Sequence, residues 1–157
     1  MEAAPLSHIK QELKNRPPAE LYELCLRLAR FKKENKELLT YLLFEAGDEA
    51  SYISVIKREM DQAFEEINKS NVYYAKKSIR KIVKITNKHI RFSGQKQTEV
   101  ELRIHFCKKL LTLKPFLSRS MALRNIYARQ LQNTRKAMQK LHEDLQFDYN
   151  QELKTLD

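Results

Sequence analysis

Residues that break helices are scarce in this chain. Glycine occurs only at positions 47 and 94, and proline only at positions 5, 17, 18 and 115. An all-β protein needs turn residues roughly every 8–12 positions, which this sequence does not supply. The frequent residues, Leu, Lys, Glu, Ala, Gln and Arg, are those that favour helices. The sequence therefore predicts an all-α protein.

Length and composition predict one helical domain over residues 1–157. A chain of this length can bury roughly 70% of its extended-chain surface, and 42% hydrophobic with 32% charged residues argues against disorder. No segment approaches the roughly 20 apolar residues that span a bilayer, so we expect no membrane insertion. Cys25 and Cys107 lie on apolar helical stripes as two buried thiols, and residues 1–10 lack the apolar region of a secretory signal. Both features favour a cytoplasmic location.

Apolar periodicity and capping residues predict about seven helices. Their expected ranges are 6–15, 18–31, 34–46, 48–67, 71–94, 97–113 and a long last helix from Ser118 or Ser120 to Leu156. These helices can stack as antiparallel pairs, either in an α–α superhelix of the HEAT or armadillo type or in an irregular helical bundle. The range 34–46 is apolar on almost every side, so we expect this helix at the centre of the fold.

The last predicted helix carries an apolar seam whose steps alternate between four and three residues. The seam consists of Tyr127, Leu131, Thr134, Met138, Leu141 and Leu145. Such spacing is found in coiled-coil dimers and also in helices that pack within one chain. Three heptads interrupted by a threonine favour packing against helices of the same chain.

The charge of the protein is concentrated in one block. Residues 67–142 contain 19 Lys or Arg but only two acidic residues, Glu99 and Glu101, whereas residues 1–66 and the acidic tail 143–157 are both net negative. We expect the tail to continue the last helix. Folded surfaces normally mix both signs, because like charges repel one another in the compact state. The basic block therefore predicts an anionic partner.

Within this block, the helix predicted at 71–94 separates its charges from its apolar residues. Five basic positions fall within an arc of roughly 80° and form a row about 20 Å long, opposite an apolar face. The row consists of Lys77, Lys81, Lys84, Lys88 and Arg91, with Arg80 alongside. Arg129, Lys136 and Lys140 form a second row on the last helix. If the two rows share one face, they can straddle the phosphates of a nucleic acid.

Two alternatives to a nucleic acid are left open by these rows. Most charged helix faces are merely solvated, and acidic residues of helix 48–67 or of the tail can neutralise the rows from across the fold. The same face can also bind an acidic protein segment. No zinc-finger, homeodomain or basic-zipper signature is present, so a nucleic acid would be held by its backbone. Tyr73, Tyr74 and Phe92 at the helix ends are expected in the core rather than as platforms for bases.

The sequence does not present a catalytic constellation, and we expect neither a metal nor another cofactor. The four histidines are widely separated and show no metal-binding spacing. Glu101 and His105, one helical turn apart, are the only acid–base pair that the spacing offers. The favoured interpretation is a non-enzymatic module that docks on nucleic acid through helices 71–94 and 120–156. The alternatives are a scaffold for an acidic protein partner and an enzyme whose site the sequence does not reveal.

Overall fold

The computed structural model describes residues 1–156, and all regular structure in this range is helical, which confirms the all-α class. The described residues form nine α-helices rather than about seven, together with one π-helical turn, η1. The elements are α1 (Leu6–Lys14), α2 (Pro18–Phe31), α3 (Lys33–Thr40), η1 (Tyr41–Glu45), α4 (Glu49–Glu65), α5 (Val72–Ser93), α6 (Lys96–Leu111), α7 (Lys114–Arg119), α8 (Met121–Met138) and α9 (Glu143–Leu153).

Contacts within the chain divide it into two compact units, Met1–Phe44 and Glu45–Asp157. A single domain over residues 1–157 stays a prediction. The first unit holds α1, α2 and α3, and the second holds α4 to α9.

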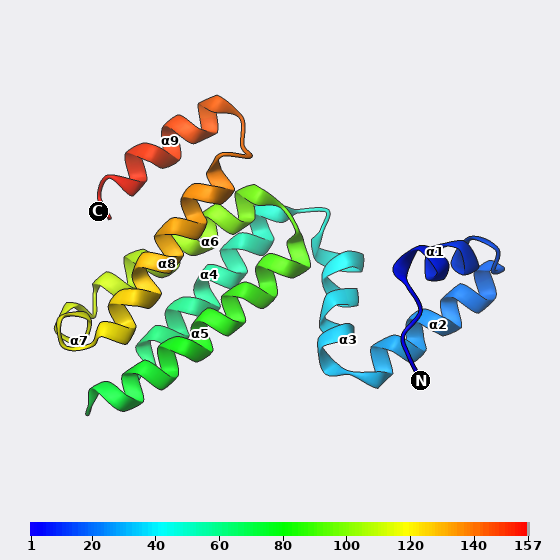
Figure 1. Ribbon diagram of the computed structural model, residues 1–157, viewed down its shortest axis with the longest axis horizontal. Coiled ribbons are helices and arrows are strands. Elements are labelled where there is room, and N and C mark those ends of the chain that lie inside the picture. The colour runs from blue at the N-terminus through cyan, green and yellow to red at the C-terminus, as the bar shows by residue number, and fades with distance from the viewer. Residues whose placement is uncertain (157) are drawn as a thin grey trace. The chain divides into compact units, whose positions relative to one another are not determined.

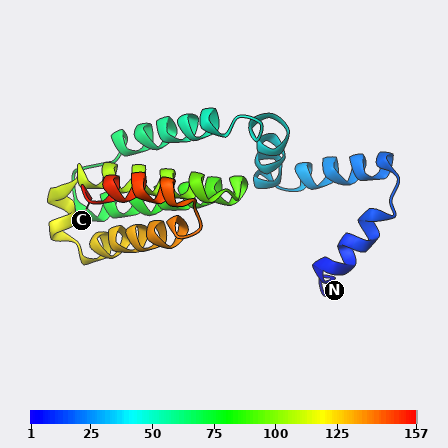
Figure 2. The same ribbon diagram turned by 90° about the horizontal axis from the view of Figure 1, so that it is seen from above.

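The second unit is built around α6. The side chains of Val100, Leu102, Phe106, Cys107 and Leu110 are fully buried, because α6 packs against α4, α5 and α8. Both views of the ribbon show these four helices running along one common direction (Figures 1 and 2). The unit is an irregular helical bundle, one of the two architectures that the sequence allowed.

Helix α5 forms where its capping residues and its apolar spacing predict it. The Asn71 side chain accepts a hydrogen bond from the backbone amide of Tyr74, at 3.0 Å, which satisfies one of the free amides at the helix start. The apolar face is buried and consists of Ala75, Ile79, Ile82, Thr86 and Ile90. Gly94 ends the helix in the left-handed conformation, with φ of 67°.

A glycine-to-alanine pair tests this helix end. We expect Gly94→Ala to lower the free energy of unfolding by about 1 kcal/mol, because a Cβ disfavours the left-handed conformation, while no neighbouring atom lies within 4 Å of the added methyl group. Gly47→Ala is the matched control, since Gly47 has no positive φ and also has open space around it. Urea unfolding measures both, and equal effects would contradict the role assigned to Gly94.

The last helix does not continue to Leu156 as expected. Ser120 is its N-cap, accepting from the Leu123 amide at 3.3 Å, but α8 ends at Met138 and α9 begins after His142. His142 accepts from the Asp144 amide at 3.3 Å, and Glu143 and Asp144 occupy the first turn, where the helix dipole favours acids. The break allows Leu153 and Leu156 to be buried, whereas a continuous helix would carry them away from the bundle.

The seam of the last predicted helix packs within its own chain. Leu131, Thr134 and Met138 are buried on α8, whose main neighbour is α6. Packing against a helix of the same chain was the favoured interpretation, and the burial of these residues confirms it.

The expectation of a central helix at 34–46 is wrong. Among the residues of α3 and η1 only Tyr41 is buried, while Leu42, Leu43 and Phe44 are 56%, 64% and 75% exposed. The central apolar helix is α6, because three helices of the second unit pack on it. Cys25 corrects a related expectation: its thiol lies on α2 and is exposed, and only Cys107 is buried.

Candidate anion-binding surface

The structure exposes nearly all of the basic residues that the sequence singled out. On α5, Lys77, Arg80, Lys81, Lys84 and Arg91 are exposed. Lys88 is half-buried, and its ammonium lies 5.8 Å from the centre of the Phe92 ring. On α8, Arg129 and Lys136 are exposed. Lys140, which the sequence placed on the same helix, is exposed in the turn after α8, because the helix ends at Met138. The predicted basic residues of both rows therefore face solvent.

The two rows meet at a hollow between α5 and α8. We call this hollow of about 380 Å³ the α5–α8 groove; its lining residues are Arg80, Val83, Ala122, Asn125, Ile126, Arg129 and Gln130. Figure 1 shows α5 and α8 running in the same direction through the second unit. Lys136 follows Arg129 on the same face of α8, seven residues on, and Lys140 lies in the turn after the helix. Arg80 and Arg129 thus bring the two rows to one side of the bundle.

A second hollow adjoins the first along α5. The α5–α6 groove, of about 760 Å³, is lined by Arg80, Val83, Lys84, Asn87, Ile90, Arg91, Gly94, Gln95, Lys96, Glu99 and Arg103. Arg80 and Val83 line both hollows. Arg80, Lys84 and Arg91 therefore face these grooves, whereas Lys77, Lys81 and Lys88 line neither of them.

Arg103, whose partners the sequence does not reveal, lines the α5–α6 groove. Its guanidinium donates to Glu99 Oε1 at 2.9 and 3.0 Å, to Asn87 at 3.1 Å and to Gln130 at 2.6 Å. Arg103 is buried, so this network ties α5, α6 and α8 together below the surface. On the sequence, Arg103 is one more cation on an apolar helix, and only its partners on other helices distinguish it.

The only acidic residue that lines either groove is held by its neighbours. Burial opposes ionisation of the Glu99 carboxyl, but hydrogen bonds from Lys96 and Arg103 outweigh it, so the pKa of Glu99 lies below its ordinary value. Lys96 lies 2.7 Å from this carboxylate. Glu99 is therefore a charged, saturated acceptor that does not neutralise the exposed rows.

The ion pairs across the bundle involve basic residues outside the two rows. Glu101 pairs with Lys57 at 2.6 Å, Asp61 with Lys109 at 3.0 Å, and Glu152 of the tail with Lys108. Within residues 1–156, no carboxylate lies within ion-pairing distance of seven basic residues, namely Lys77, Arg80, Lys81, Lys84, Arg129, Lys136 and Lys140. Acids of α4, α6 and the tail thus neutralise cations of α4 and α6 and leave these seven residues without a carboxylate partner.

The aromatic residues at the start of α5 are not core residues, contrary to expectation. Tyr73 and Tyr74 are 63% and 47% exposed, and their rings contact one another edge to face at 5.5 Å. Phe92, at the other end, is half-buried against His89. Tyr73 lies two turns before Arg80 on the same side of α5, so an exposed ring continues the groove side of the helix.

The acid–base pair suggested by spacing does not form. Glu101 binds Lys57 and the Tyr149 hydroxyl, the latter at 3.0 Å, while His105 Nε2 lies 2.6 Å from Asp61. Burial raises the pKa of the Cys107 thiol to about 12, so this group stays protonated and unreactive at neutral pH. In the described part of the chain, no three His, Cys, Asp or Glu residues are close enough to hold a metal ion.

Comparisons with known proteins add no relative: no family model, curated protein or solved structure matches the chain.

None of the helices formed by residues 1–156 has both the length and the apolar character that crossing a membrane requires.

Proposed function

We propose that this protein is a non-enzymatic module that binds the backbone of a nucleic acid along the α5–α8 and α5–α6 grooves. One observation carries the proposal: exposed cations without acidic partners, contributed by two helices, converge on one side of the bundle. Such an arrangement raises the electrostatic free energy of the folded protein, because like charges repel one another. Binding of a polyanion lowers this free energy and releases the counterions of the polyanion.

The basic residues contribute to phosphate binding in different ways, because they lie at different positions. Arg80 and Arg129 stand where the rows meet and present guanidinium groups that can bind phosphate oxygens in a bidentate way. Lys84 and Arg91 extend the contact along α5, Lys136 extends it along α8, and Lys140 extends it into the turn after α8. Because most of these groups are mobile lysines or exposed arginines, they read the backbone rather than the base edges.

An acidic protein segment is the alternative partner, and one feature favours it. Val83, Ala122 and Ile126 line the α5–α8 groove between the cations. A polypeptide can place an apolar side chain there and acidic side chains on either side, whereas a phosphate backbone leaves this apolar lining unused.

Anisotropy of a labelled random duplex and a labelled single strand, measured across about 50 to 300 mM salt, tests the proposal. We expect micromolar or tighter binding at the low end. If four to seven phosphates are contacted, the log–log salt slope for the duplex will be about −4 to −6. The exposed Tyr73 ring offers a stacking face only to unpaired bases, so the single strand is expected to bind at least as tightly as the duplex.

Competition separates the two partner classes. Unlabelled polyglutamate at matched charge concentration should displace the nucleic acid only weakly if phosphates are the cognate ligand. Absence of binding to both nucleic acids at about 50 mM salt, together with tight binding of an acidic polypeptide, would contradict the proposal. That result would instead favour a scaffold that binds an acidic protein segment.

A further inference from the structure

The first unit, residues 1–44, has helices but almost no core. Helices α1, α2 and α3 each contain no buried residue. Ten large apolar side chains of this unit are between 41% and 84% exposed, among them Leu24, Leu28 and Phe31 on one face of α2. The helices have 9, 14 and 8 residues, whereas an isolated helix shorter than roughly 12–15 residues is marginal in water. This unit therefore needs a further surface to bury its apolar faces.

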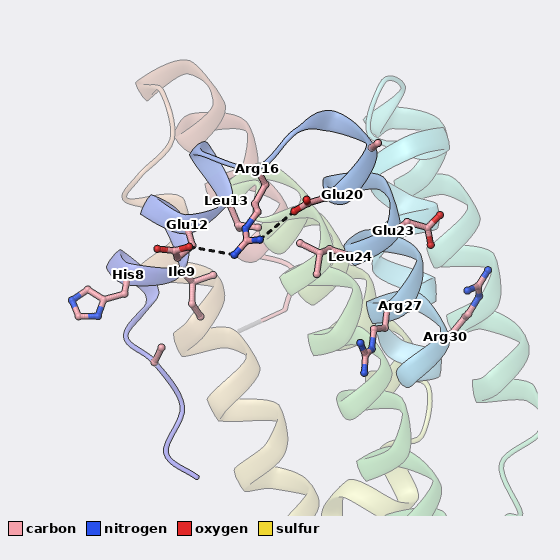
Figure 3. A pocket seen from close by; sticks show the side chains of 12 residues that line it. His8, Ile9, Glu12, Leu13, Arg16, Glu20, Glu23, Leu24, Arg27 and Arg30 are labelled. Carbon is pink, nitrogen blue, oxygen red and sulfur yellow. Dashed lines mark hydrogen bonds and ion pairs between the residues drawn. The ribbon is translucent and has the colours of Figure 1, made fainter.

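The apolar faces of α1 and α2 meet in a groove of about 860 Å³, which we call the α1–α2 groove. Ile9 and Leu13 of α1 and Leu24 of α2 line it, and Figure 3 shows Leu24 directed into the space between the two helices. Across the joint, Arg16 pairs with Glu12 at 3.5 Å and with Glu20 at 3.2 Å. These three side chains are exposed, so the pairs contribute little to holding the groove together.

The rim of this groove carries both signs of charge. Glu12, Glu20 and Glu23 lie on it together with Arg16, Arg27 and Arg30. Within residues 1–156, Glu23, Arg27 and Arg30 have no ion-pair partner. A strongly acidic partner would be repelled by the glutamates of this rim, and a strongly basic partner would be repelled by its arginines. Under a twofold axis, however, each acidic position can face a basic position of an identical rim.

The exposed apolar area also matches an interface between two copies. The ten exposed side chains of the whole unit, of which Ile9, Leu13 and Leu24 line the groove, present on the order of 1,000 Å², and a standard interface buries roughly 800 Å² on each partner. Monomers rarely leave this much apolar surface uncovered in one small unit.

We infer that the α1–α2 groove is the interface of a symmetric homodimer, in which α1 and α2 of one copy cover the groove of the other. The inference does not depend on the proposed nucleic-acid function. A dimer would present two copies of the basic surface, so that a single long polyanion could be bound twice.

Sedimentation velocity of the full chain between about 1 and 200 µM tests the inference through mass action. We expect the wild-type protein to sediment as a dimer at the upper concentrations. Leu24→Asp should sediment as a monomer throughout, because the interface would bury an unpaired carboxylate. Phe147→Asp is the matched control: Phe147 is 64% exposed and lies on α9 in the other unit, so this variant should dimerise like the wild type.

A monomer at every concentration up to about 200 µM would overturn the inference and leave the groove to a different protein.

Discussion

Replacing Phe106 with alanine should lower the free energy of unfolding by about 3–5 kcal/mol, the usual cost of a cavity left by a buried phenylalanine. Phe106 is fully buried on α6, and its ring lies 5.5 Å from that of Phe64 on α4. Because α4, α5 and α8 all pack on α6, the cavity would lie where these helices meet. Urea unfolding followed by circular dichroism measures the change.

Phe147→Ala is the matched control for this substitution. It removes the same side chain from an exposed position on α9, so we expect a change within about 0.5 kcal/mol. Equal losses in the two variants would contradict the assignment of α6 as the centre of the bundle.

Reversing the two arginines of the α5–α8 groove, in the double variant Arg80→Glu with Arg129→Glu, should weaken nucleic-acid binding about 100-fold or more at about 0.1 M salt. Losing two phosphate contacts accounts for roughly 60-fold, and the two new carboxylates add repulsion. The salt slope should become shallower by about 2. Anisotropy measures both quantities.

The same variant should keep the melting temperature of the wild type or raise it, because it relieves repulsion between uncompensated cations. Arg58→Glu with Lys69→Glu is the control of equal net charge, since both residues are exposed and neither lines a groove. We expect this control to weaken binding only a few-fold. Equal weakening in the two double variants would mean that overall charge, and not the groove, holds the nucleic acid.

If both the homodimer and the nucleic-acid proposals hold, Leu24→Asp will also weaken binding to long strands while leaving binding to short strands unchanged. Two surfaces on one dimer bind a long strand with a high effective local concentration, and a strand too short to reach both gains nothing. A loss of affinity for short strands would instead indicate that residues 1–44 contact the ligand directly.

Local features of the sequence were sufficient to predict much of the second unit. The cap at Asn71, the end at Gly94 and the apolar positions from Ala75 to Ile90 define α5 without reference to any other helix. They do so because capping and the 3.6-residue period act between neighbours along the chain. The exposed basic row follows directly, since burying the apolar face of a helix turns the opposite face to solvent.

Features that depend on distant residues were not predictable in this way. The segments 34–46 and 97–113 are both strongly apolar, and only the packing of three helices on α6 decides which of them is central. The burial of Arg103 depends in the same way on Asn87 and Gln130, which lie on other helices. The sequence near His142 contains an N-terminal helix signal in Glu143 and Asp144, but the apolar seam crossing it suggested one continuous helix.

The sequence by itself therefore determined the all-α class, the limits of most helices and the concentration of positive charge on one face of α5, because these properties depend on residues close together in the chain. The tertiary structure alone decided that Arg80 and Arg129 line one groove and that the acids of α4 and the tail neutralise other cations. It also decided that the apolar faces of α1 and α2 stay exposed. These properties depend on which helices become neighbours in space, and residues far apart in the chain determine that choice.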